Sequence, residues 1–210
     1  MFGTDEPPSL ADRRRRAARD AILDAAWALC RERGLGGWTL RDLARSVGLK
    51  APSLYAYFDS KTAIYDALFR QGYEAFGEVA DRWDAAFAAG THPRTVFADG
   101  ARDFMWFCTS DPARHQLLFQ RVIPDFEPSA ESYELAVVLL DRFRDFMARA
   151  GVDDDAAVDL WTAIATGLAD QQISNDPGGE RWVRLVDRAV EMFCDHVNLP
   201  AQPATDEGAR

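Results

Sequence analysis

The chain has 210 residues, 48% of them hydrophobic and 28% charged, a composition that suits one globular domain or two closely packed ones rather than a disordered chain. No apolar run approaches the roughly 18 residues that cross a bilayer, and the polar N-terminus lacks a signal-peptide pattern, so we expect a cytoplasmic protein with no membrane partner. The net charge of −10 is uneven, because residues 1–61 carry +3 and the remainder −13. Such a basic end is able to approach a polyanion that the acidic body repels, although the asymmetry can equally serve solubility.

Three cysteines, Cys30, Cys108 and Cys194, are scattered along the chain. Their odd number and wide spacing fit neither a disulfide framework nor a zinc site. We therefore expect reduced thiols in the core, and neither a metal nor a cofactor.

Apolar residues recur every three or four positions along nearly the whole chain, and the alternation typical of strands is missing. We expect an all-α fold, with a three-helix N-terminal domain over residues 13–60 and a helical body over 61–198. Residues 1–12 and 199–210 are expected to be flexible tails. The nine expected helices span residues 13–33, 39–47, 53–58, 61–89, 93–109, 112–122, 130–149, 154–174 and 179–198.

The boundaries of the first three helices have clear chemical signals. Gly34 is placed to end the first helix, and Gly48 to end the second. Thr39 and Asp42 have the spacing of a capping box at the start of the second helix. Pro52 suits the first position of the third. Two short helices joined by a tight turn and braced by a longer one predict a DNA-reading helix-turn-helix.

The third helix has to enter a major groove about 12 Å wide, so its outward side chains should be polar or aromatic and of modest length. Its inward residues, Leu54 and Phe58, are expected to pack on Leu43 and Val47. Residues 13–16 are all arginine and form either a basic arm for DNA or a solvated run of charge. The residues expected to contact DNA are Thr39, Arg41, Lys50, Ala51, Pro52, Ser53, Tyr55, Tyr57 and Lys61.

Over residues 18–65 the sequence resembles the TetR family of bacterial regulators. The residues that carry the resemblance are 22–26, Arg33 and Gly34, 39–44, 48–58 and Lys61. One departure is Lys50-Ala51, where many members of that family have a Ser or Thr that caps the recognition helix. The start of this helix is then expected to depend mainly on Pro52.

The resemblance implies that the body senses a ligand and dimerises. The last two predicted helices carry apolar stripes and small residues, which favour a four-helix interface with two-fold symmetry, or alternatively a core within one chain. The residues assigned to the interface are Trp161, Leu168, Trp182, Val186, Val190 and Phe193. In addition, Trp161, Gly167 and Leu168, together with residues 114–124, resemble a TetR subfamily marked by a Trp…Gly signature.

The middle helices are rich in aromatic residues, which usually form a plain core and in this family also line a cavity. Polar residues among them would orient a small apolar ligand. The residues assigned to this pocket are Phe104, Phe107, His115, Phe119, Phe143, Trp161 and Gln171.

These features predict a dimeric transcriptional regulator, a repressor that binds a palindromic operator and is released by an unidentified small-molecule effector. One alternative is a regulator that needs no ligand or answers to a protein partner. The other is an enzyme with an accessory DNA-binding head. The body has no nucleophile elbow, no phosphate loop and no clustered metal ligands, and its three histidines are scattered. We therefore expect no enzyme and assign no catalytic residue.

Overall fold

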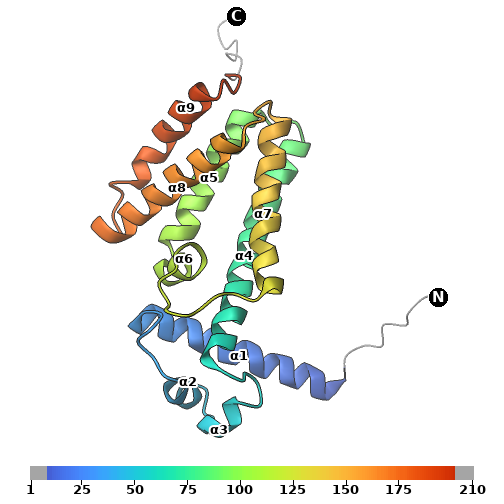
Figure 1. The fold of residues 1–210 in the computed structure, drawn as a ribbon, viewed down its shortest axis with the longest axis vertical. Coiled ribbons are helices and arrows are strands. Elements are labelled where there is room, and N and C mark those ends of the chain that lie inside the picture. Colours follow the sequence, from blue (N-terminus) through green and yellow to red (C-terminus); the bar gives the residue numbers. More distant parts are fainter. Residues whose placement is uncertain (1–8, 202–210) are drawn as a thin grey trace, which may run out of the picture.

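The computed structural model describes residues 9–201, and residues 1–8 and 202–210 lie outside that range. The helices are α1 (Leu10–Arg33), α2 (Leu40–Ser46), α3 (Ala51–Leu54), α4 (Lys61–Ala88), α5 (Pro93–Thr109), α6 (Pro112–Phe119), α7 (Ala130–Arg149), α8 (Asp155–Asn175), the 3-10 turn η1 (Val183–Leu185) and α9 (Val186–His196). No strand occurs within residues 9–201, as the sequence predicts. Helices α1 to α3 form a head at one end of the molecule, and α4 rises from this head into a body that contains α5 to α9 (Figure 1).

Residues 10–12 and Leu199 belong to ordered structure, although the sequence predicts that they lie in flexible tails. Helix α1 begins at Leu10 rather than at residue 13, with Ser9 as its N-cap. At the other end Leu199 is only 2% exposed, and its N–H bonds the carbonyl of Cys194 at 2.8 Å across Asn198, whose φ is +54°. This left-handed residue closes α9 in a Schellman-type turn that returns the chain to the body. The predicted tail boundaries are therefore wrong at residues 10–12 and at Leu199.

Among the internal helices, α3, α6 and α9 differ most from the predictions. Helix α3 is regular only over Ala51–Leu54, so Pro52 is its second residue rather than its first. Helix α6 ends at Phe119 instead of residue 122, ahead of Pro124, whose ring disfavours a helical conformation in the residue before it. Helix α9 starts at Val186 rather than residue 179, after a loop and the turn η1. The ranges of α5 and α7 agree with the expected helices.

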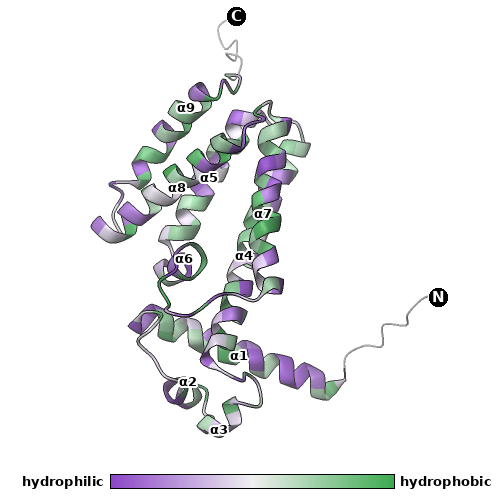
Figure 2. Cartoon of the chain, viewed as in Figure 1, coloured by the Kyte–Doolittle hydropathy of each residue, from purple (hydrophilic) through white to green (hydrophobic). Residues whose placement is uncertain are grey.

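Two hydrophobic clusters fill the molecule. The head cluster is built around Ile22, Leu43 and Leu54, and the body cluster contains most buried side chains of α5, α8 and α9. Helix α6 belongs to both, because Leu117 packs in the head cluster and Leu118 in the body cluster. Figure 2 shows the contrast with the first turns of α1, which are hydrophilic and lie at the edge of the head. The two clusters therefore meet along α4 and α6, which contribute side chains to both.

Polar contacts fix the junctions between head and body. Arg31 on α1 donates from Nη2 and Nε to Oδ2 of Asp111, at 2.7 and 2.9 Å, where Asp111 caps α6. Asp66 on α4 accepts the N–H of Ser129 at 2.7 Å and the hydroxyl of Ser132 at 2.9 Å. A carboxylate at the N-terminus of α7 is also favoured by the helix dipole. Arg31 thus ties α1 in the head to α6, and Asp66 ties α4 to the start of α7.

The three cysteines are free and buried within the described residues, which confirms them as core thiols. Burial raises the pKa of the Cys194 thiol to about 11, so this side chain stays protonated at neutral pH. No group of His, Cys, Asp or Glu within residues 9–201 is arranged to hold a metal ion.

Helix α4 packs tightly on α6 at Gly72, and we expect Gly72→Ala to destabilise the protein. A Cβ at this position would lie 2.8 Å from Cδ2 of Leu118, a buried side chain that has little room to move. Overpacking of this kind costs about 1–3 kcal/mol in the free energy of unfolding. Thermal and urea unfolding followed by circular dichroism measures the change.

Gly77→Ala is the matched control on the same helix, because a Cβ there meets open space. Alanine in a helix interior is favoured over glycine by about 0.5–1 kcal/mol, so this variant should be slightly stabilised. Equal stability of the two variants would contradict the close packing of α4 on α6.

Candidate nucleic-acid interface

Helix α2 is closed at both ends by the residues that the sequence indicates. The Thr39 hydroxyl accepts the N–H of Asp42 at 3.2 Å, and the Asp42 carboxylate accepts the N–H of Thr39 at 3.0 Å. The Thr39 hydroxyl also donates to Oδ2 of Asp42 at 2.6 Å, and this bond, with the one from the Thr39 N–H, holds the pKa of Asp42 below its usual range. At the other end Gly48 has a φ of +69° and lets Leu49 N–H bond the carbonyl of Ala44 at 2.8 Å. The predicted capping box and glycine stop are both confirmed.

Helix α3 is a single helical turn that continues as a tighter turn. No side chain caps its start at Lys50, which agrees with the missing Ser or Thr. Beyond the regular turn, the N–H groups of Tyr57 and Phe58 both bond the carbonyl of Leu54, at 2.9 and 3.1 Å. Leu54 and Phe58 are buried in the head cluster beside Leu43, as predicted. The inward face of the unit is therefore fixed by packing, and its outward face is left to solvent.

The predicted DNA-contacting residues gather at the end of the molecule away from the body, around α2 and α3 (Figure 1). One of them, Tyr55, has a large aromatic side chain that is 52% exposed. The Thr39 hydroxyl takes part in the capping box and so stabilises the start of α2. The exposed residues are Thr39, Arg41, Lys50, Pro52, Ser53 and Tyr55, and the half-buried ones are Ala51, Tyr57 and Lys61.

Lys61 has an intramolecular role that the sequence does not reveal. Its Nζ donates to the carbonyl of Trp38 at 2.7 Å and lies 4.2 Å from the centroid of the Trp38 ring. Burial lowers the pKa of this ammonium. Lys61 therefore supports the residue just before the start of α2. Since an ammonium has three donors, two remain for a phosphate.

Two arginines on α1 hold the turn that follows α3, a role that the sequence did not indicate for either of them. Arg15 Nη2 donates to the carbonyl of Ala56 at 3.1 Å, and Arg19 donates to the carbonyl of Tyr57. The Arg19 guanidinium also lies 4.2 Å from the centroid of the Phe58 ring. Cations suit the carbonyl end of a helical turn, where the backbone carbonyls lack partners. The four-residue spacing of the two arginines places them on one face of α1, which is the only sequence signal for this role.

The predicted pocket residues do not form one site. Phe104, Phe107, His115 and Phe119 cluster together, and the ring centroids of Phe104 and Phe119 are 5.4 Å apart. Phe143 and Trp161 instead join a second aromatic group around Phe97. In both groups the rings pack against one another. A groove of about 350 Å³ lies elsewhere, between α4 and α5 beside Trp83 and several charged side chains.

Gln171 is wrong as a pocket residue, because it is exposed and accepts a hydrogen bond from Asn175 at 2.8 Å. The next residue, Gln172, is the buried one, at 2% exposure. Its Oε1 accepts the N–H of Trp182 at 2.8 Å, and its Nε2 donates to the carbonyl of Gly179 at 3.0 Å. Gln172 thus satisfies the backbone of the loop between α8 and η1.

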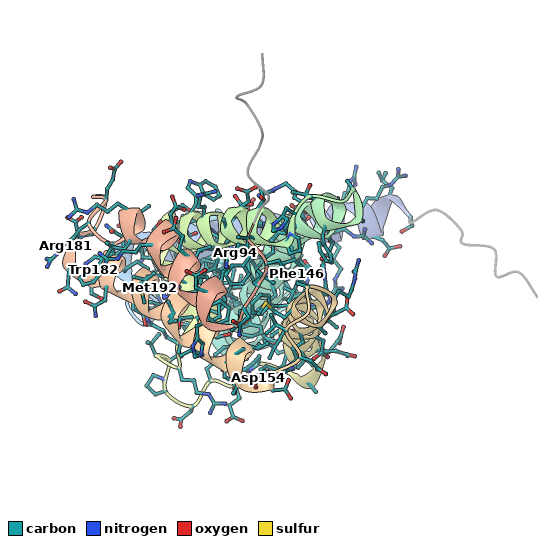
Figure 3. All side chains as sticks on the ribbon, turned by 90° about the horizontal axis from the view of Figure 1, so that it is seen from above. Arg94, Phe146, Asp154, Arg181, Trp182 and Met192 are labelled. Atoms are coloured by element: carbon teal, nitrogen blue, oxygen red, sulfur yellow. The ribbon has the colours of Figure 1, made fainter. Side chains whose placement is uncertain are left out.

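The predicted interface stripe is buried within the chain. Trp161, Val186, Val190 and Phe193 are 3–7% exposed and belong to the body cluster, while Leu168 and Trp182 are half-buried against it. The prediction of an interface is therefore wrong for the first four residues, because their side chains are already covered by their own chain. Figure 3 places Met192 and Trp182 on the side of the body formed by α8 and α9.

Comparison with known proteins identifies the head. Residues 22–68 match the family model of bacterial regulatory proteins of the tetR family. Over these residues, about a fifth of its length, the chain is similar to members of this family. It is 50% identical over 48 residues to the biofilm operon icaADBC HTH-type negative transcriptional regulator IcaR of Staphylococcus aureus (strain Newman), a match that covers 23% of this chain and 26% of IcaR. It is 42% identical over 53 residues to the class D tetracycline repressor protein of Escherichia coli, covering 25% of this chain and 24% of that protein.

The likeness extends to the body only as a fold. A bacterial regulatory protein in the tetR family from Rhodococcus RHA1 superposes with a TM-score of 0.67 over 88% of this chain and 98% of that one, at 18% identity. The chain spans about a quarter of the length of the curated relatives it matches. The Trp…Gly subfamily stays a prediction, since the family model ends before Trp161. The matched model describes regulatory proteins, and IcaR is described as a transcriptional regulator. No helix within residues 9–201 is long and apolar enough to cross a membrane.

We expect Arg19→Ala to loosen the end of α3. The variant loses a charged hydrogen bond to Tyr57 and a cation–π contact with Phe58, which together are worth about 1–3 kcal/mol. Faster amide hydrogen exchange at Tyr57 and Phe58, together with a lower urea midpoint, would report it. Arg16→Ala is the control, because that guanidinium is exposed on the same helix. Equal exchange in the two variants would contradict the role given to Arg19.

Proposed function

We propose that this protein represses transcription by binding a palindromic DNA operator as a homodimer, and that a small molecule bound in its body releases it. The observation that carries the proposal is the complete helix-turn-helix at the free end of the molecule, with α2 capped, α3 clamped and polar side chains turned outward. IcaR, which matches over this unit, is described as a negative transcriptional regulator. The proposed site of action is the cytoplasm, where bacterial DNA is found.

The charge distribution supports an approach to DNA by one face only. Residues 1–61 carry a formal +3 and the rest of the chain −13. The exposed cations of the head include Arg41 and Lys50, which lie on the outward side of α2 and α3. Phosphate contacts of this kind supply most of the affinity for DNA in general, and they weaken as salt rises. The acidic body would oppose any other orientation.

A homodimer is supported by the outer face of α8 and α9, opposite the buried stripe. On this face Leu160 is 43% exposed and Met192 63%, and Val183 precedes α9 with 37% exposure. A Cβ at Gly167 would meet open space, so another backbone can approach closely there. Two copies joined through this face would present two copies of α3, as the reading of two half-sites requires.

Release is supported by the position of α6. Its residues Ala113 and Leu117 pack in the head cluster, whereas Leu118 and His115 face the body. A molecule that binds the body best when α6 is displaced would shift the population of head orientations away from the one that fits DNA.

A second candidate is a regulator that needs no small molecule. The packing of the aromatic rings of Phe76, Phe104, Phe107 and Phe119 on one another favours it, because a filled core leaves little room for a ligand. In that case operator binding would be constitutive or controlled by a protein.

The operator test uses palindromes from the promoter region of the protein's own gene, with half-sites about 34–36 Å apart. We expect specific binding at least about 10³-fold tighter than to random DNA at about 0.15 M salt, in mobility-shift assays. Tyr57→Ala should weaken binding to all sequences by a similar factor, as loss of a phosphate contact does. Affinity for palindromes no greater than for random DNA would refute the proposed operator recognition, and a loss confined to one base would place Tyr57 in direct readout.

The dimer test introduces charge on the outer face of α8 and α9. We expect Met192→Glu combined with Leu160→Glu to shift the protein to a monomer in analytical ultracentrifugation, because two buried carboxylates would face their symmetry copies. Val122→Glu is the control, since Val122 is 47% exposed in the connection after α6. A double variant that remains dimeric while folded would exclude this face as the interface.

A further inference from the structure

A cluster of three polar side chains links α6 to α8 in the middle of the body. His115 Nε2 lies 2.6 Å from Oδ1 of Asp170, and Gln120 Nε2 donates to the same oxygen at 2.7 Å. His115 is 1% exposed, whereas the Asp170 side chain keeps 42% of its surface. The cluster therefore extends from the core to solvent, with the carboxylate at its accessible end.

The hydrogen bonds leave one atom of His115 and one of Asp170 without a partner. A carboxylate only accepts, so the shared proton lies on His115 Nε2, and Nδ1 is the other ring nitrogen. This Nδ1 is buried and has no hydrogen-bond partner among the described residues. Oδ2 of Asp170 likewise receives no hydrogen bond from residues 9–201, since both bonds to this side chain end on Oδ1. Buried groups without partners are uncommon in native proteins and call for an explanation.

Asp170 is not paired with a lysine or an arginine in the described part of the chain. Its one ionisable partner there is His115. Most other carboxylates near the body surface, such as Asp84 and Asp187, are paired with arginines. Asp170 thus presents a free negative charge beside the core of an already acidic body.

Aromatic rings surround the buried end of the cluster. The His115 and Phe119 ring centroids are 5.5 Å apart, and Phe119 lies against Phe104 and Phe76. Phe104 and Phe119 are half-buried rather than enclosed. A carboxylate next to partly accessible aromatic faces is the combination that attracts an organic cation, because ring faces and carboxylates both carry negative potential.

We propose that His115, Gln120 and Asp170 form the polar end of the effector site and that the effector is a small aromatic or aliphatic amine bound as its ammonium ion. This inference rests on the proposed release by a small molecule. An ammonium has three donors and no acceptor, so it matches the Asp170 carboxylate, whose Oδ2 receives no hydrogen bond from the described residues. A carboxylic acid would face Asp170 with like charge, and an alcohol would bring at most one donor.

The position of the cluster connects binding to the head. His115 lies on α6, two residues from Leu117 and Ala113, both of which pack in the head cluster. An ammonium that draws Asp170 toward itself would change the His115 and Gln120 bonds that tie α6 to α8. The amine would therefore act on α6 directly.

The experiment uses three probes that share a phenyl ring and differ in head group, namely 2-phenylethylamine, 2-phenylethanol and phenylacetate. Isothermal titration calorimetry of the full chain without DNA should show the amine binding at least tenfold more tightly than either of the others. Equal or tighter binding of the alcohol or the acid would overturn the proposal. So would a lack of binding by the amine at about 10 mM, above the range of weak small-ligand affinities.

Asp170→Asn tests the anchor, and Asp159→Asn is its control on an exposed position of the same helix. We expect the first to lose at least tenfold in amine affinity and the second to match the wild-type chain, with unfolding curves recorded for both. Amine affinity unchanged in a folded Asp170→Asn variant would overturn the assignment. If that variant does not fold, the comparison of head groups on the wild-type chain decides the matter.

The consequence for DNA is measured separately. Saturating 2-phenylethylamine should weaken operator binding by about tenfold, a typical coupling between two sites. Amine binding that leaves operator affinity unchanged would overturn the effector role. Because calorimetry is done without DNA, a failure of operator binding leaves the amine result standing, and a failure of amine binding leaves operator recognition standing.

Discussion

The packing of α6 between the two hydrophobic clusters is the constraint on which the rest of the structure depends. This helix has eight residues, yet Leu117 lies in the head cluster and Leu118 in the body cluster. Protein interiors are close-packed and resist continuous deformation, so α6 cannot shift without a response from both clusters. Gly72 on α4 shows how tight the arrangement is, because the Leu118 side chain occupies the space where a Cβ would stand. Head and body therefore form one mechanical unit, although they have separate cores.

The polar contacts that hold α6 are stronger than most of the ion pairs on the surface. Exposed pairs such as Arg121 with Glu127 contribute about 0–1 kcal/mol, since water screens both charges. The Asp111 side chain is only 8% exposed, so Arg31 compensates a charge that would be costly to leave unpaired. At the other end of α6, Gln120 is tied to Asp170 on α8. The helix is thus anchored to α1 at its start and to α8 just past its end.

The sequence predicts local structure well where the signal is local. The capping box of Thr39 and Asp42, the turn at Gly48 and the inward pair Leu54 and Phe58 depend on near neighbours, and all are as expected. The clamp of Arg15 and Arg19 on α3 joins residues about 40 positions apart, and no local pattern could have indicated it. Gln171 and Gln172 show the same limit, because a shift of one position on a helix turns a side chain by about 100°, and neighbouring glutamines give no sign of which one faces inward.

The misplaced interface has a more general physical cause. A stripe such as Val186, Val190 and Phe193 is the most hydrophobic face of its helix, and the chain buries that face first, against its own core. A surface that meets a second copy has to remain soluble before the copies associate, so it is less apolar and more mixed in composition. The outer face of α8 and α9 fits this description, with Leu160 and Met192 exposed and with Gly167 open to a close approach. A single α3, with one regular turn, reaches few base pairs, so the specificity of the proposed operator complex would depend on the geometry that this modest face imposes on two heads.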